Sequence, residues 1–155
     1  MWFAKTVSCR TPEEWLAALP AIRKARYAVI ETSAGRLQAV HLRWFPKLID
    51  LPELWPVASR YHAKGRTDRC LLYYNQPRSC PGFLALKYLV SSRGTNYATC
   101  RAAITTLDAI AAEKQIDAVV CDAANGRLSD RLLARQGWEK HKPQRWHRNF
   151  IKRFY

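Results

Sequence analysis

The order in which hydrophobic patterns follow one another after Phe83 constrains the fold more than any other feature of this chain. Phe83 to Val90 is an apolar and aromatic run typical of a strand. Apolar residues from Ala103 to Ala111 then recur at spacings of three and four, which places them on one face of a helix. Ala118 to Cys121 is apolar at every position, as in a strand covered on both faces. Together the segments predict a right-handed crossover within a parallel or mixed sheet.

The remaining C-terminal segments continue this alternation of helix and strand. A second helix is expected to end at Gly137 and to bury Leu128, Leu132 and Leu133. The residues from Arg145 to Tyr155 alternate as in a final strand, whose core-facing side carries Trp146, Phe150 and Phe154. The order strand, helix, strand, helix, strand predicts an α/β fold of mixed α+β type.

The N-terminal half predicts one more helix and three strands. Thr11 is a hydroxyl cap that is followed by a proline and two acidic residues, which is typical of a helix start. Pro20 is expected to kink this helix or to separate its last turn. The first two strands form a predicted hairpin and the third lies beside Phe83–Val90: Tyr27–Thr32, Leu37–Trp44 and Cys70–Tyr74. Phe45–Gly65, which contains three prolines, favours short helices and loops.

Size and composition describe a chain that can hold its own core. Its 155 residues are expected to form a single domain over 1–155, and 48% of them are hydrophobic, which excludes a disordered basic tail. No apolar run approaches the length of about 20 residues that a membrane span needs, and Met1–Arg10 lacks the apolar stretch of a signal peptide. We therefore expect a soluble, cytoplasmic protein with no membrane contact.

The cysteines do not follow the spacing of a disulfide framework or a zinc site. Their number is odd and no two of them form a CxxC pair, and we expect all five to be small core residues: Cys9, Cys70, Cys80, Cys100 and Cys121. His141 and His147 lie in a segment without cysteine. No metal site is expected.

The link between the predicted strand at Phe83–Val90 and the following helix is small, polar and basic. It contains Ser91, Ser92, Arg93, Gly94 and further polar residues as far as Thr99. In sheets of this kind ligands bind at the carboxyl ends of strands, where the N–H groups of a helix N-terminus attract anions. The link is therefore a candidate phosphate-binding loop, and the alternative is an ordinary connection that uses Gly, Ser and Asn as turn and cap residues.

Two motifs in this half of the chain resemble those of the acetyl-CoA-dependent N-acetyltransferase (GNAT) superfamily. Residues Arg93–Ala98 resemble the loop Q/R-x-x-G-x-G/A at Arg93 and Ala98, with Asn96 in place of a glycine. Residues Asn125–Glu139 resemble the later helix motif N-x-x-A-x-x-L-Y-x-x-x-G-F, with about one extra residue. The resemblance implies a central mixed, mostly antiparallel sheet with helices on both faces. It also implies a transferase that moves an acetyl group from acetyl-CoA, or another acyl-CoA, to an amine.

The resemblance also implies which residues hold the cofactor. The expected acetyl-CoA contacts are the loop and its flanks, main chain at the end of the preceding strand, and one asparagine: Leu89, Val90, Arg93, Gly94, Thr95, Asn96, Tyr97, Ala98, Thr99 and Asn125. The tyrosine that protonates the leaving thiolate in many members falls at Leu132 or Leu133, and leucine cannot donate a proton. Tyr97, Cys121 and Tyr88 are alternatives for an acid or base, but each is equally a packed core residue, so no catalytic residue is assigned.

The net charge of +14 calls for an anionic partner. Lys140–Arg153 is the most basic run, and aromatic residues interleave it, a combination that suits nucleic acid. The alternative interpretation is an edge strand with one basic, solvated face and one aromatic face on the core. Two functions therefore remain open: an acyl-CoA-dependent N-acyltransferase, and a catalytically silent basic module of the same fold that binds nucleic acid or an acidic partner.

Overall fold

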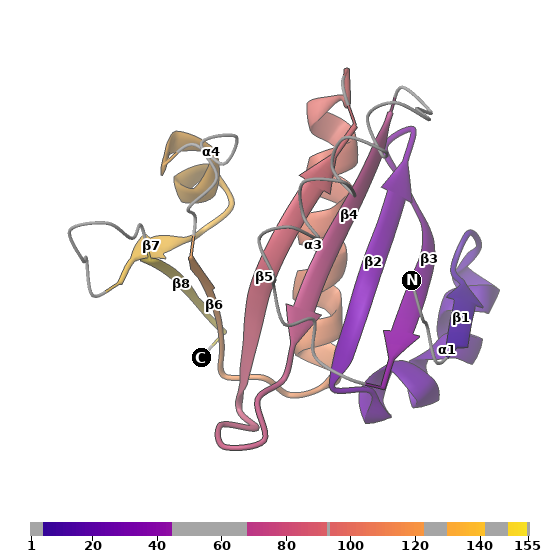
Figure 1. Cartoon of the computed structure of the whole chain (residues 1–155), viewed down its shortest axis with the longest axis horizontal. Coiled ribbons are helices and arrows are strands. Elements are labelled where there is room, and N and C mark those ends of the chain that lie inside the picture. The colour runs from indigo at the N-terminus through magenta and orange to yellow at the C-terminus, as the bar shows by residue number, and fades with distance from the viewer. Residues whose placement is uncertain (1–4, 45–67, 93, 123–129, 142–148, 155) are drawn as a thin grey trace.

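The computed structural model describes residues 5–44, 68–92, 94–122, 130–141 and 149–154. Along the chain the elements are β1 (Lys5–Ser8), α1 (Pro12–Lys24), β2 (Tyr27–Ser33), β3 (Arg36–Arg43), β4 (Arg69–Asn75), β5 (Phe83–Ser91), α3 (Tyr97–Glu113), β6 (Ala118–Asp122), α4 (Asp130–Arg135), β7 (Glu139–Lys140) and β8 (Asn149–Arg153). The eight strands form one sheet in the order β1-β3-β2-β4-β5-β6-β8-β7 (Figure 1).

The sheet is mixed and mostly antiparallel, as expected. Within the described residues β5 and β6 form its one parallel pair, and α3 connects them. The predicted hairpin of β2 and β3 is confirmed, and so is the prediction that β4 and β5 are neighbours. The structure adds that β4 and β5 pair antiparallel. The short strands β1 and β7 were not predicted, because segments of four and two residues carry too little hydrophobic pattern.

The helix start at Thr11 is confirmed. The Thr11 hydroxyl accepts a hydrogen bond from Glu14 N at 3.2 Å, and Pro12 lies in the first turn. Of the two alternatives for Pro20, a kinked continuation or a separate last turn, the separate turn is excluded, because α1 continues through Pro20 as far as Lys24. Pro20 and Leu16 are both exposed, so water can reach the Leu16 carbonyl that a helical N–H at position 20 would otherwise bond.

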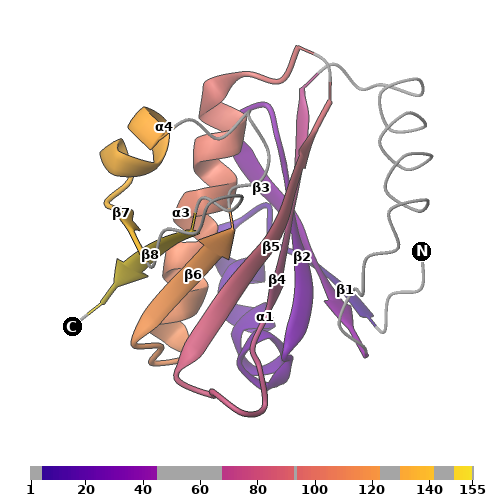
Figure 2. The same cartoon turned by 60° about the vertical axis from the view of Figure 1, so that its left-hand side comes forward.

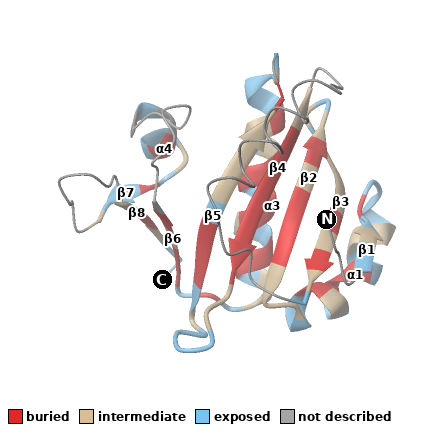
Figure 3. Ribbon diagram, in the orientation of Figure 1, coloured by how far each residue is buried: buried red, intermediate tan, exposed pale blue. Residues whose placement is uncertain are grey.

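The core lies mainly between the sheet and the helices α3 and α1, which occupy the same face (Figure 2). The apolar stripe predicted for α3 is confirmed, since Ala103, Ile104, Leu107, Ile110 and Ala111 are all buried. Figure 3 shows that the central strands β2 and β4 are buried along most of their length. A smaller cluster lies on the opposite face, which we call the second face, and it consists of Val29, Leu71 and Tyr73 with Tyr88 and Val90 packed against them.

The cysteine prediction is confirmed for three residues and wrong for one. Cys9, Cys70 and Cys121 are buried, and Cys100 is half-buried. Cys80 is exposed because it lies in the turn between β4 and β5, and such connections run over the protein surface. All five are free thiols.

The C-terminal strand does not have the single aromatic face that its alternation predicted. β8 lies between β6 and β7, so it is not an edge strand of the described sheet. Phe150 and Ile151 are both buried although neighbouring residues of a strand point to opposite faces, whereas Phe154 is exposed beyond the end of β8. Trp146 lies outside the described residues.

No helix in the described part of the chain has both the length and the apolar character needed to cross a membrane.

Lys114, at the C-terminal end of α3, forms hydrogen bonds with the C-terminal end of α1. Its Nζ donates to the carbonyl oxygens of Arg23 at 2.9 Å and Ala25 at 2.7 Å, and to Oε1 of Gln76 at 3.0 Å. These bonds satisfy carbonyl groups at the C-terminus of α1, where the helix has no N–H donors left. Burial, together with the charge of Arg26, lowers the pKa of Lys114 to about 8.

We expect Lys114→Met to destabilise the fold by about 2 kcal/mol, because a side chain of similar length leaves these acceptors without their donor. Urea unfolding followed by circular dichroism measures the change. Lys24→Met, at an exposed position on α1, is the matched control and should change stability by less than about 0.5 kcal/mol. Equal stabilities for the two variants would contradict the role of Lys114.

The pH dependence gives a second readout of the same residue. A pKa of about 8 in the folded state lies below the value near 10.4 of an unfolded lysine, so between these pH values the unfolded chain binds more protons. This group therefore makes stability rise with pH over that range. The rise should be smaller in Lys114→Met than in the unchanged protein.

Candidate functional site

The parallel ladder between β5 and β6 ends before β5 does. It pairs Phe83–Leu86 with Ala118–Cys121, and β5 then continues for five residues to Ser91. We call Lys87–Ser91 the β5 overhang. Figure 1 shows β5 and β6 diverging from their shared lower end. The pairing of β5 with β4 shifts at the same point, because Tyr74 lies opposite Leu86 but Tyr73 lies opposite Tyr88.

This shift is a β-bulge with Lys87 as the extra residue, and it explains the divergence. A bulge bends its strand and increases the local twist. β5 keeps its antiparallel partner β4 on one side as it bends, whereas the described pairs with β6 end at Leu86 and Cys121. The overhang therefore carries the end of β5 away from β6 at the carboxyl ends of two parallel strands.

Hydrogen-bond alternation sets the direction of the main chain along the overhang. Ser92 N donates to Arg69 O at 2.9 Å, so by alternation Val90 also directs its main-chain groups toward β4. Leu89 directs its N–H and carbonyl to the other side, toward β6. Of the two strand residues predicted to contact the cofactor, Leu89 therefore has main-chain groups in position to pair with a ligand, and Val90 is paired with Leu71.

The loop after the overhang is fixed to the start of β4. Gly94 is exposed and has a φ of +82°, a conformation that favours glycine. Thr95 Oγ1 lies 3.0 Å from Arg69 O and 2.7 Å from Ser92 O. One turn into α3, the buried Thr99 accepts a hydrogen bond on Oγ1 from Gly35 N at 2.9 Å. Arg93 lies outside the described residues.

A carboxylate of the chain itself lies at the N-terminus of α3. Asp68 accepts hydrogen bonds from Asn96 N at 3.1 Å and from Asn96 Nδ2 at 3.4 Å. A hydrogen bond from the Thr99 side chain is the main cause that lowers the Asp68 pKa, and the bonds from Asn96 add to it. Asp68 thus neutralises part of the positive charge at the helix N-terminus, where the sequence predicted a phosphate. The N–H groups of Tyr97 and Ala98 in the first turn have no carbonyl partner within the helix and are directed out of its end.

Sequence reasoning missed Asp68 because it precedes a different strand, 28 positions before Asn96. The antiparallel pairing of β4 with β5 brings the start of β4 next to the end of β5. A lone aspartate in front of a strand gives no local signal of this contact.

Tyr97 extends from the first turn of α3 toward the end of α4. Its side chain is exposed, and its hydroxyl accepts a hydrogen bond from Gln136 Nε2 at 3.1 Å. Gln136 follows α4 directly, and Gly137, with a φ of +84°, ends that segment as predicted. The contact joins the start of α3 to the part of the chain beyond β6.

The other residues considered as an acid or base are packed side chains. Cys121 is buried opposite Leu86, at the last pair of the parallel ladder. Tyr88 lies edge-on to Tyr73 with ring centroids 6.1 Å apart, and burial raises its pKa. Leu133 is buried in the core. Asn125 lies outside the described residues.

Neither a comparison with the sequence profiles of known protein families nor one with curated protein sequences gives a match for this chain. The functional argument therefore depends on the arrangement of β5, β6 and α3.

We expect Asp68→Asn to destabilise the fold by about 1 kcal/mol at neutral pH, because a negative charge at a helix N-terminus and a charge-assisted bond to Asn96 N are both lost. The folded pKa of Asp68 is lowered, so its contribution is present above the ordinary value near 4 and is lost as the pH falls below it. Thermal unfolding at neutral and acidic pH measures this difference. A difference between variant and parent that does not shrink in acid would show that the charge is not its source.

Proposed function

We propose that this chain is an acyl-CoA-dependent N-acyltransferase of the GNAT type, which transfers an acetyl group to an amine. The observation that supports it best is the divergence of β5 from β6 directly before the N-terminus of α3. Divergent carboxyl ends of parallel strands beside a helix N-terminus form a common binding place for ligands that carry phosphate groups.

In this proposal each part of acetyl-CoA has a partner on the chain. Leu89 offers main-chain N–H and carbonyl groups to the amides of the pantetheine arm. The first-turn N–H groups of Tyr97 and Ala98 hold the pyrophosphate, with Gly94 and Thr95 in the approaching loop and Arg93 adding positive charge. Asn125 contacts CoA by resemblance. A helix covering the second face belongs to the same proposed architecture, and the cytoplasm is the proposed compartment.

The reaction is a direct attack of the amine nitrogen on the thioester carbonyl carbon. The new C–N bond forms, the C–S bond breaks, and CoA leaves as a thiolate while the amine loses a proton. Positioning of the two reactants supplies much of the rate in such a transfer, so a leucine at the tyrosine position, Leu132 or Leu133, is compatible with activity. No side chain is assigned as a general acid or base.

The negative charge of Asp68 opposes the binding of a phosphate at the N-terminus of α3. Its carboxylate occupies Asn96 N and would repel a phosphate brought to the same helix end. Binding therefore requires a cation that offsets Asp68, and we assign this role to Arg93, which precedes Asn96 by three positions in the sequence.

Isothermal titration calorimetry with acetyl-CoA tests the proposal. Arg93→Glu should weaken binding at least about tenfold, because one charge-assisted contact to phosphate contributes about 1.5 to 3 kcal/mol. Arg101→Glu makes the same charge change at an exposed position farther along α3 and should alter the affinity by no more than about twofold. Absence of binding at about millimolar acetyl-CoA would overturn the proposal.

The second function, a basic module that binds nucleic acid, is favoured by one specific observation. Asp68 already fills part of the anion-binding helix end, while the whole chain carries a net charge of +14. A protein that neutralises several phosphates releases counterions, so its affinity falls steeply with salt.

Fluorescence anisotropy with a labelled single-stranded oligonucleotide tests this second function. We expect the affinity to fall at least about tenfold between about 50 and 200 mM salt if several phosphates are neutralised. An affinity that does not change over this range would exclude binding that neutralises several phosphates.

A further inference from the structure

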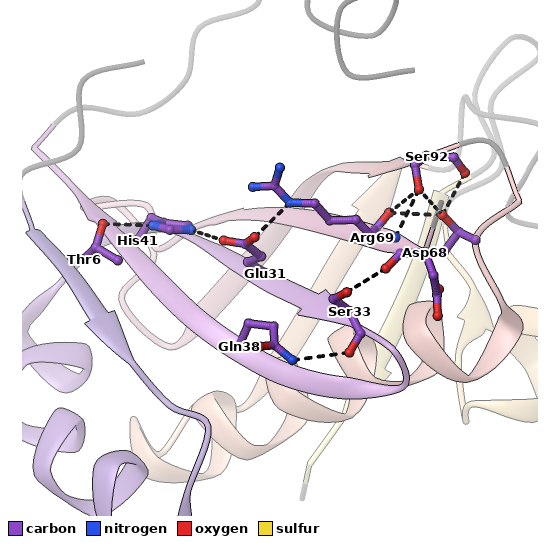
Figure 4. Close-up of polar contacts among 9 residues, drawn as sticks. Thr6, Glu31, Ser33, Gln38, His41, Asp68, Arg69 and Ser92 are labelled. Carbon is purple, nitrogen blue, oxygen red and sulfur yellow. Dashed lines mark hydrogen bonds and ion pairs between the residues drawn. The ribbon is translucent and has the colours of Figure 1, made fainter. Parts of the chain in front are cut away.

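Four polar side chains form a continuous row across four strands on the second face (Figure 4). Thr6 on β1 is bonded to His41 on β3, with 2.9 Å between Thr6 Oγ1 and His41 Nδ1. His41 Nε2 lies 2.6 Å from Glu31 Oε2 on β2. The other oxygen of Glu31, Oε1, lies 2.8 Å from Nε of Arg69 on β4.

We propose that Thr6 is a nucleophile activated by His41 and oriented through Glu31, and that this site accepts an acyl group from small activated esters. The order hydroxyl, imidazole, carboxylate, with each neighbour in hydrogen-bond contact, is an arrangement in which a general base activates a hydroxyl nucleophile and a third group orients the base. The site uses none of the residues proposed to hold CoA, so it stands or falls independently of the proposed function.

The protonation of the row follows from the charge of Glu31. A hydrogen bond from His41 is the main cause that lowers the pKa of Glu31, and the charge of Arg69 acts in the same direction. An ionised carboxylate can only accept, so His41 donates its Nε2–H to Glu31. In the neutral imidazole Nδ1 is then the acceptor, and the Thr6 hydroxyl donates to it. His41 is thereby oriented to take the hydroxyl proton.

The exposure of the three groups matches these roles. Thr6 is exposed, whereas the side chains of His41 and Glu31 are only 12% and 14% exposed. An ester can therefore reach the hydroxyl while the base and the carboxylate stay shielded from water. Shielding strengthens the hydrogen bond between them, because the local dielectric constant is lower than that of water.

The strand register supports the short contact between Thr6 and His41. The two residues lie directly opposite each other. Cys9 N donates to Gln38 O at 3.0 Å, and alternation along the ladder then makes Thr6 and His41 a non-hydrogen-bonded pair, the type whose side chains lie closest together.

The same alternation directs Thr6 N–H away from β3, toward the side of β1 on which the described sheet has no further strand. A main-chain N–H beside the nucleophile is a suitable donor for the negatively charged oxygen that forms during acyl transfer.

The reaction with p-nitrophenyl acetate can be written completely. Thr6 Oγ attacks the carbonyl carbon as its proton moves to His41 Nδ1, the C–O bond to p-nitrophenolate breaks, and p-nitrophenolate leaves with the electron pair. The proton on His41 passes to the solvent. Water then hydrolyses the acetyl-threonine to acetate and restores the hydroxyl.

Burst kinetics with p-nitrophenyl acetate and peptide mapping by mass spectrometry test the proposal. All variants carry Cys80→Ser, because an exposed thiol also reacts with this ester. We expect one acetyl group on Thr6 and a burst of p-nitrophenolate. Thr6→Val should abolish both, Thr6→Ser should keep both, and Thr105→Val, at an exposed threonine of α3, should change neither.

His41→Gln and Glu31→Gln distinguish the proposed mechanism from the alternative that these hydrogen bonds only stabilise the sheet. We expect acetylation of Thr6 to slow at least about tenfold in each, since removal of a general base or of the group that orients it has an effect of this size or larger. Acetylation of Thr6 at an unchanged rate in His41→Gln would overturn the proposal. So would a burst that survives Thr6→Val, or an acetyl group found only on lysines. If a glutamine variant does not fold, the comparison of Thr6→Val with Thr6→Ser still decides the question.

Discussion

The burial of α3 against the sheet is the interaction on which the rest of the molecule depends. Ala103, Ile104, Leu107 and Ile110 lie against the central strands, and each buried Leu or Ile side chain contributes about 1.5 to 3 kcal/mol. α3 also connects the parallel strands β5 and β6, so its packing determines where β6 joins the sheet. β8 and β7 then extend the sheet from β6. A change that detaches α3 would therefore disturb both halves of the sheet and the candidate site between them.

The parts of the fold that could be predicted from sequence are those with a repeated local pattern. The stripe on α3, the hairpin of β2 and β3, and the cap at Thr11 each follow from residues close together in the chain. The errors concern context. Pro20 is tolerated because its side of α1 faces water, and β8 is not an edge strand because the two-residue strand β7 pairs with it. Neither circumstance is visible in the residue itself.

The candidate site was harder to predict than the fold for the same reason. Leu89 and Tyr97 follow from their places at the end of a strand and the start of a helix. Asp68 does not, because its contact with Asn96 depends on how β4 and β5 pair. The row from Thr6 to Arg69 depends on the register of four strands, and a slip of one residue in any of them would turn a member to the opposite face.

The bulge at Lys87 has an effect on side chains as well as on the direction of β5. Leu84 and Leu86 belong to the core beneath α3, and in a regular strand the next even-numbered residues would point the same way. The extra residue reverses this alternation, so Tyr88 and Val90 pack on the second face and Leu89 takes the place against the core. The bulge therefore divides β5 into two parts: before Lys87 the even-numbered residues face the core, and after it the even-numbered residues lie on the second face. A regular strand that kept Lys87 in the ladder would turn the Tyr88 ring into the layer already filled by α3, so the sequence of this strand requires the bulge.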